Sequence, residues 1–139
     1  MKYQKKIHEK DLKDTVSIRG EAQTIFSNLR DNFCTTLETY ETNSVSANQT
    51  FQINEWVRKD GGGGISSILR GSIIEKAGVH LSTVYGVLPA GALSDQKSEA
   101  MDFWASGISV IIHPSSPFIP SAHLNLRMIV TDKYWFGAV

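Results

Sequence analysis

Hydrophobic residues recur at helical intervals in the first third of the chain. Between about Leu12 and Tyr40 they follow a spacing of three or four residues, which predicts helix with one core-facing stripe. The stripe comprises Ala22, Ile25, Phe26, Leu29, Phe33, Leu37 and Tyr40. Leu12 and Val16 could form a separate short helix broken near Gly20, because glycine is a poor helix former. Residues 1–42 are therefore expected to be helical.

From residue 50 onward, the pattern changes to short extended segments separated by glycine. Residues 42–49 are a polar connector between the two regions. The expected β segments are 51–58, 66–69, 72–74 and 79–87, with a turn at Gly61–Gly64. Residues 95–106 are predicted to form a second helix that ends at Gly107. The whole chain, residues 1–139, is thus expected to be one α+β domain, an antiparallel sheet flanked by helices.

Polar side chains alternate with apolar ones between residues 109 and 127. Because successive side chains in a strand point to opposite faces, one face should carry polar groups and the other Leu and Ile. The residues expected on the polar face are Ser109, Ile111 and His113 on the first strand and His123, Asn125 and Arg127 on the second. Three prolines between the strands exclude helix and stiffen the return. If the strands pair, His113 and His123 should lie near each other.

This stretch also resembles a known family. The pattern S-x-x-x-H-P-x-x-P-x-x-P-x-x-H-x-N-x-R, from Ser109 to Arg127, is similar to that of the oxygen-dependent coproporphyrinogen III oxidases of haem (porphyrin) biosynthesis. Three further blocks resemble family motifs and follow in family order: W-x-R-x-x-G-G-G-G at 56–64, E-K-A-G-V-H-x-S-x-V-x-G at 75–86, and Y-W-F-G at 134–137. At position 80 the family more often has asparagine than histidine.

The resemblance implies a reaction and a set of site residues. Family enzymes convert two propionates of coproporphyrinogen III to vinyl groups, yielding protoporphyrinogen IX, with dioxygen as the oxidant and without an organic cofactor. The intact family is expected to be homodimeric. The resemblance assigns substrate binding to Ser109, Asn125, Leu126 and Arg127, and proton donation to His123. These residue types suit a tetracarboxylate, because a guanidinium matches carboxylate oxygens and histidine exchanges protons near neutral pH.

A divalent metal is a second possible role for the histidines. His113 and His123 could both be ligands, as has been proposed for bacterial family members. However, two imidazoles fall short of the three or four protein ligands usual for zinc, and His8 and His80 offer no obvious help. In the alternative, His123 transfers a proton and His113 is a neighbour that orients it.

Bulk properties exclude some other classes of protein. The formal net charge is zero, so there is no electrostatic signal for nucleic acid, and no apolar run is long enough to span a membrane. The single cysteine, Cys34, can form no internal disulfide, which favours a reduced, cytoplasmic protein.

The motifs cover only the N-terminal half of the family pattern. We therefore expect a truncated family domain, or one piece of a split enzyme, whose own activity is open. The alternative is a non-catalytic tetrapyrrole-binding or subunit-forming remnant.

Overall fold

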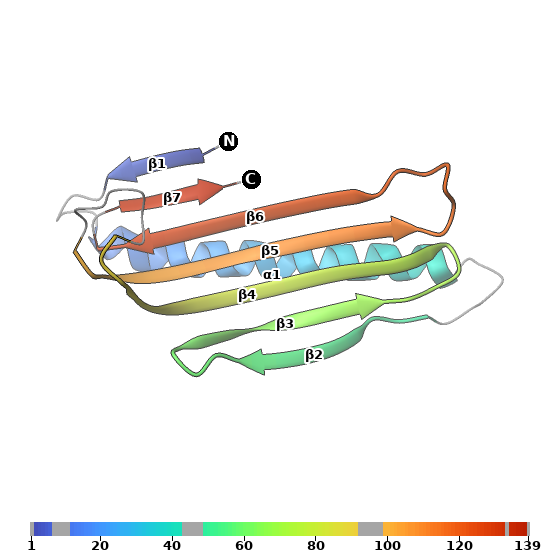
Figure 1. The fold of residues 1–139 in the computed structure, drawn as a ribbon, viewed down its shortest axis with the longest axis horizontal. Helices are drawn as coiled ribbons and strands as arrows, with labels where there is room; N and C mark the ends of the chain where they lie inside the picture. The colour runs from blue at the N-terminus through green and yellow to red at the C-terminus, as the bar shows by residue number, and fades with distance from the viewer. Residues whose placement is uncertain (1, 7–11, 43–48, 92–98, 133, 139) are drawn as a thin grey trace.

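The structure is a computed structural model that describes residues 2–6, 12–42, 49–91, 99–132 and 134–138 (Figure 1). It has one long helix, α1 (Leu12–Thr42), and seven strands. The strands are β1 (Lys2–Lys6), β2 (Gln52–Val57), β3 (Gly62–Leu69), β4 (Ile74–Leu88), β5 (Met101–Pro114), β6 (Ala122–Thr131) and β7 (Tyr134–Ala138). No helix in this described part is long and apolar enough to cross a membrane.

The strands form one antiparallel sheet with the order β1-β7-β6-β5-β4-β3-β2. From β2 to β7 each strand pairs with the next along the chain, so the sheet is a meander with β1 added beside β7. Helix α1 packs on one face, against β4, β5 and β6 (Figure 1). This two-layer arrangement confirms the α+β prediction.

The helix lies on the sheet through an apolar stripe that differs in part from the predicted one. Ala22, Phe26 and Leu37 are buried, whereas Ile25 and Tyr40 are 57% and 58% exposed, so their assignment to the core was wrong. In a helix with 3.6 residues per turn, the position in phase with Leu37 is 41 rather than 40. The predicted break near Gly20 was also wrong, because α1 is continuous over its 31 residues.

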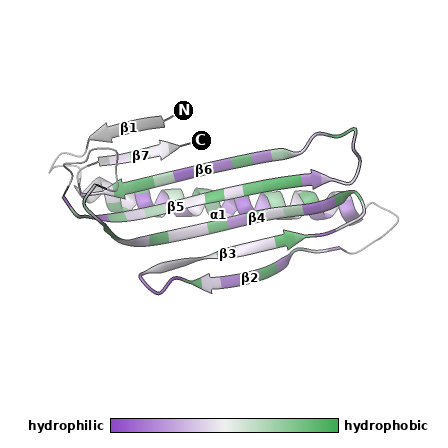
Figure 2. Cartoon of the chain, viewed as in Figure 1, coloured by the Kyte–Doolittle hydropathy of each residue, from purple (hydrophilic) through white to green (hydrophobic). Residues whose placement is uncertain are grey.

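The sheet has two chemically different faces. The face under α1 carries buried side chains from the central strands, including Val79, Trp104, Ile108, Val110, Met128 and Val130. Hydrophobic and hydrophilic residues alternate along the first part of β6, as expected for a strand covered on one side, whereas the end of β5 carries a continuous hydrophobic run (Figure 2). The opposite face, called the open face below, carries the intervening residues.

Two other predicted elements were wrong. Residues 2–6 of the predicted helical segment form β1, and residues 101–106 of the predicted second helix belong to β5. Residues 95–98 and the connector residues 43–48 lie outside the described part of the chain. So short a segment has no decisive local period, and pairing of β5 with β4 over nearly its whole length favours the extended form.

The predicted glycine turn is shifted towards β2. The amide of Gly61 donates to the carbonyl of Arg58 at 3.2 Å, which closes the turn, and β3 begins at Gly62. Gly61 and Gly62 have φ angles of 117° and 89°, values that glycine adopts without strain.

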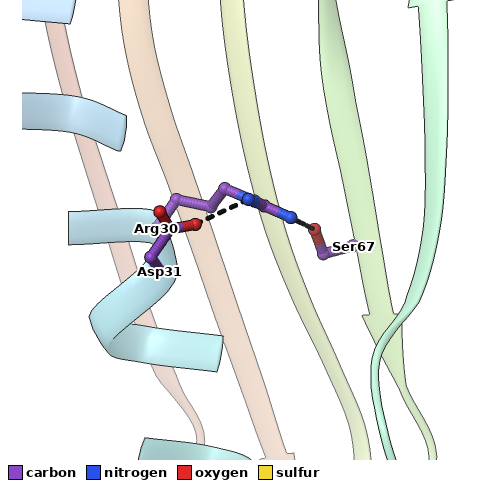
Figure 3. Close-up of polar contacts among 3 residues, drawn as sticks. All are labelled: Arg30, Asp31 and Ser67. Atoms are coloured by element: carbon purple, nitrogen blue, oxygen red, sulfur yellow. Dashed lines mark hydrogen bonds and ion pairs between the residues drawn. The ribbon is translucent and has the colours of Figure 1, made fainter. Parts of the chain in front are cut away.

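Polar contacts also fix α1 on the sheet. Arg30 donates through Nε and Nη2 to the hydroxyl of Ser67 on β3, each at 3.4 Å, and forms an ion pair of 2.6 Å with Asp31 (Figure 3). At the penultimate position of α1, the fully buried Glu41 accepts hydrogen bonds from the main-chain amides of Ser72, Ile73 and Ile74. The last turn of α1 is thus tied to the β3–β4 connection.

Candidate functional site

The open face carries aligned rows of small and polar residues. Directly opposed positions on successive strands place Asn54, Ser66, His80, Ser109 and Asn125 in one row across β2 to β6. The next row contains Trp56, Gly64, Ser82, Gly107 and Arg127. Serine and glycine occupy much of the centre of these rows, so the side chains there project only a short distance from the sheet.

The structure brings most of the predicted site residues together. Asn125 lies directly opposite Ser109, and Arg127 lies opposite Gly107, on the adjacent strands β6 and β5. His123 lies opposite Ile111 and precedes Asn125 and Arg127 on β6 at the same alternating positions, so all three side chains are on one face. The strand pairing and shared face predicted from the alternation are therefore confirmed.

A small hollow of about 50 Å³ lies over these strands. It is lined by His80, Ser82, Gly107, Ile108, Ser109, Asn125, Leu126 and Arg127. No lining residue is acidic, and Arg127 contributes a permanent positive charge. Hydroxyl, amide, imidazole and guanidinium groups can all donate hydrogen bonds, so the hollow suits an anionic group such as a carboxylate.

The side chain of Leu126 points to the opposite face of the sheet from those of Asn125 and Arg127. By strand alternation its side chain is on the helix side of β6, where it packs against the core. A substrate contact from Leu126 would therefore have to come from its main chain.

A second, more apolar hollow adjoins the first. It has a volume of about 300 Å³ and shares Ser82 and Arg127 with the small one. Its remaining lining residues are Val84, Leu88, Phe103, Ala105, Ser106 and Ile129. An apolar surface that ends at an arginine matches a ligand with a carbon framework and peripheral carboxylates. A separate cavity of about 410 Å³, beside Arg19 and Trp104, contains none of the predicted site residues.

The two histidines of the metal hypothesis are diagonal neighbours. His123 opposes Ile111, whereas His113 lies two positions further along β5 and opposes Lys76 of β4. Among the described residues, no three His, Cys, Asp or Glu side chains gather into a possible metal site. The ammonium of Lys76 beside His113 would also oppose a bound cation. These residues alone therefore do not fit a complete metal site.

We expect the isolated chain to bind zinc or copper weakly. Two imidazole ligands must be deprotonated to bind a metal ion, so any affinity should be lower in acid than at neutral pH. Dialysis against zinc followed by elemental analysis checks this, with His113→Ala and His123→Ala as comparison variants. A stoichiometric metal that survives dialysis and disappears in both variants would show a true site.

Sequence reasoning missed His80 and Ser82 as members of the site. Strand alternation alone places both residues on one face of β4, together with Gly78. Their position beside Ser109 and Gly107 depends on the register between β4 and β5, which pairs residues distant in sequence. Trp56 also lies on this face, against Gly64, whereas Trp104 is in the core.

Known proteins resemble this chain over most of its length. The family described as "Coproporphyrinogen III oxidase" matches residues 21–139. Coproporphyrinogen-III oxidase 1, chloroplastic, from Arabidopsis thaliana is 37% identical over 87% of this chain and 35% of its own length. The oxygen-dependent coproporphyrinogen-III oxidase of Rickettsia bellii is 39% identical over 81% of this chain and 42% of its own length. The oxygen-dependent coproporphyrinogen-III oxidase of Drosophila melanogaster is 33% identical over 91% of this chain and 35% of its own length.

The matched region includes every strand from β2 to β7 and therefore the whole open-face site. The chain spans 35 to 42% of the length of these three relatives. The matched family is the one that the four motif blocks resemble. The chain belongs to the coproporphyrinogen III oxidase family.

Proposed function

We propose that the chain forms the substrate-binding face of an oxygen-dependent coproporphyrinogen III oxidase. The observation that carries the proposal is the alignment of Ser109, Asn125 and Arg127 around one anion-compatible hollow, with His123 next along the strand. The substrate would be coproporphyrinogen III and the product protoporphyrinogen IX. The names of the relatives are consistent with this reaction.

Each side chain has a role that follows from its chemistry. Arg127 binds a propionate carboxylate through paired N–H donors, while Asn125 and Ser109 hydrogen-bond to carboxylate or pyrrole N–H groups. The apolar hollow next to Arg127 accommodates ring carbons. These contacts hold the reacting propionate in one orientation, which is a main source of catalysis in a reaction without a protein nucleophile.

His123 supplies the proton that the reaction consumes. For each propionate, the carboxylate carbon leaves as carbon dioxide, a hydrogen leaves the chain, and a vinyl group forms. Dioxygen takes up the two electrons and becomes hydrogen peroxide. Starting from an ionised carboxylate, this balance requires one proton from outside the substrate, which an imidazolium can donate. No organic cofactor enters the balance.

An assay of the chain with coproporphyrinogen III tests the proposal. The expected result is protoporphyrinogen formation that requires dioxygen, either with the chain alone or after addition of the C-terminal part of a relative. Formation that proceeds without dioxygen, or that no C-terminal part can restore, would contradict it.

Binding without turnover is the second candidate function. This function is favoured by the openness of the face. Arg127 and His123 are both exposed, and the hollow over the strands that Arg127 lines is small. A tetrapyrrole on this face would lie against the sheet but would not be enclosed. Coproporphyrin binding by the chain, together with inactivity even after addition of a C-terminal part, would support this function over catalysis.

Arg127→Ala should weaken coproporphyrin III binding about tenfold or more, because a charge-assisted pair with a carboxylate is lost. Arg127→Lys should recover part of the affinity, since it restores the charge but not the paired donors. Fluorescence titration measures both. Arg70→Ala, which removes an exposed arginine from the β3–β4 connection, is the matched control and should bind as the parent does. Equal affinity of Arg127→Ala and the control would contradict the assigned role.

Three further properties are proposed on the same family membership: the oligomeric state, the location and the absence of nucleic-acid binding. We propose that the enzyme acts as a homodimer in the cytoplasm and binds no nucleic acid. The zero net charge and the single cysteine are consistent with these assignments. Light scattering of the protein at several concentrations tests the dimer.

A further inference from the structure

Ser82 of β4 borders both hollows of the site but has no role in the binding scheme above. Ser82 and Arg127 are the two residues common to the linings of the small hollow and the apolar hollow. We propose that Ser82 is a second anchor for the substrate carboxylate that Arg127 binds, with Gly107 as the floor between them. This inference rests on the proposed function and adds a binding residue to it.

The register of the sheet places the two side chains on either side of one glycine. Gly107 of β5 lies directly opposite Ser82 on β4 and directly opposite Arg127 on β6. All three positions are on the open face, and strands two apart in a sheet are separated by about 10 Å. The long side chain of Arg127 can cross part of that distance. A carboxylate over Gly107 can therefore meet the guanidinium and the Ser82 hydroxyl together.

The space over Gly107 is open to a ligand. A Cβ atom added at this position would have the carbonyl oxygen of Leu126 at 2.6 Å and the Cα and Cβ atoms of Arg127 at 3.2 and 3.4 Å as its nearest neighbours. These atoms belong to the main chain of β6 and to the first atom of the Arg127 side chain. Gly107 itself lines the small hollow, so its surface faces that space.

The glycine on the other side of Ser82 is covered instead. Gly64 of β3 lies opposite Ser82, and a Cβ atom added there would lie 2.6 Å from Cζ2 and 2.8 Å from Cε2 of Trp56. The indole ring thus fills the space over Gly64. Of the two glycines that flank Ser82 in its row, Gly107 is the one that leaves room for a ligand.

The hydroxyl and the guanidinium are both available to an anion. Among the described residues, the Ser82 hydroxyl forms no hydrogen bond, Arg127 forms no ion pair, and no acidic side chain lines either hollow. On the opposite face, by contrast, the hydroxyls of Thr83 and Ser106 lie 2.9 Å apart and bind each other. A carboxylate accepts hydrogen bonds at both oxygens, so it can use both donors at once.

The boundary between the hollows suits a propionate in particular. From Ser82 and Arg127, the apolar hollow continues past Val84, Ala105 and Ile129. A pyrrole ring in this hollow can direct its propionate chain towards the row of Ser82 and Arg127. The carboxylate then lies at the polar end of an apolar surface, where both donors reach it.

Two substitutions of equal size isolate the hydroxyl. Ser82→Thr keeps it, whereas Ser82→Val replaces it with a methyl group, and both side chains are favourable in strands. In fluorescence titration with coproporphyrin III, the dissociation constant of Ser82→Val should be about tenfold higher than that of Ser82→Thr, as expected for loss of a hydrogen bond to a charged group. Ser66→Ala removes a hydroxyl from the same face of β3, outside both hollows, and should bind as the parent does.

A double-mutant cycle tests whether the two residues hold one carboxylate. The effects of Ser82→Ala and Arg127→Ala on affinity should be clearly less than additive. Thermal unfolding of each variant confirms that the fold is kept. Equal affinities of folded Ser82→Thr and Ser82→Val, or full additivity of Ser82→Ala with Arg127→Ala, would overturn the inference while leaving the function in place. A parent chain that binds no coproporphyrin would overturn both.

Discussion

Replacement of His123 by glutamine should lower the rate of oxygen-dependent protoporphyrinogen formation about 100-fold. Glutamine keeps a polar side chain of similar length but cannot donate a proton at neutral pH. The affinity for coproporphyrin III should change little, because Arg127 and its neighbours still hold the carboxylate. The expected result is therefore a lower kcat with a nearly constant KM, measured by product fluorescence under air.

His113→Gln is the matched control for this prediction. It removes an exposed histidine from the same face, one diagonal step from His123. If His113 only orients its neighbour, the loss of rate should be several times smaller than for His123→Gln. Equal losses in the two variants would instead indicate that the pair acts as a unit, and an unaffected His123→Gln would remove the proton-donor role.

Loss of Glu41 should have the largest effect on stability. Its carboxylate is fully buried and accepts main-chain hydrogen bonds from Ser72, Ile73 and Ile74 at 2.9, 3.0 and 2.6 Å. Glu41→Ala leaves these three amide groups without that acceptor. At about 1 kcal/mol for each unsatisfied group, the free energy of unfolding should fall by about 3 kcal/mol. Urea denaturation followed by circular dichroism measures this, and Glu21→Ala, an exposed change on the same helix, should have little effect.

The same residue makes stability depend on pH. Burial alone would raise the pKa of the Glu41 carboxyl, but the hydrogen bonds from Ile74, Ser72 and Ile73 outweigh burial and lower this pKa below its ordinary value. A carboxyl with a lower pKa in the folded state stabilises the fold above its unfolded pKa, about 4.3. That contribution is lost as the pH falls through the folded pKa. Glu41→Gln should therefore flatten the decrease of unfolding free energy below about pH 4, whereas Glu21→Gln should not.

The parts of the fold that depend on local pattern could be predicted from the sequence. The alternation of Ser109, His123, Asn125 and Arg127 correctly indicated two paired strands with one polar face, because a period of two is an unambiguous β signal. The central part of α1 was similarly clear. Residues 101–106 were assigned to a helix because this short segment has no decisive period, and pairing with the neighbouring strands β4 and β6 selects the extended form.

Features that depend on distant partners could not be predicted. His80 enters the site through its register with Ser109, and no local property of β4 contains that register. Nothing in the local sequence distinguishes Glu41 from a surface carboxylate of a helix, because its hydrogen-bond donors lie 31 to 33 residues further along the chain. In both cases a polar residue acquired its role from tertiary pairing.

The central claim is that the open face of β4–β6 is the tetrapyrrole-binding face. Nuclear magnetic resonance of side chains during titration with coproporphyrin III tests it most directly, because the ring current of the macrocycle shifts nearby signals strongly. We predict large shifts for the Asn125 side-chain amide and the His123 ring, and little change for the indole N–H of Trp104, which lies under α1. Shifts concentrated on Trp104 and Tyr85, which line the cavity beside Arg19, would contradict the account.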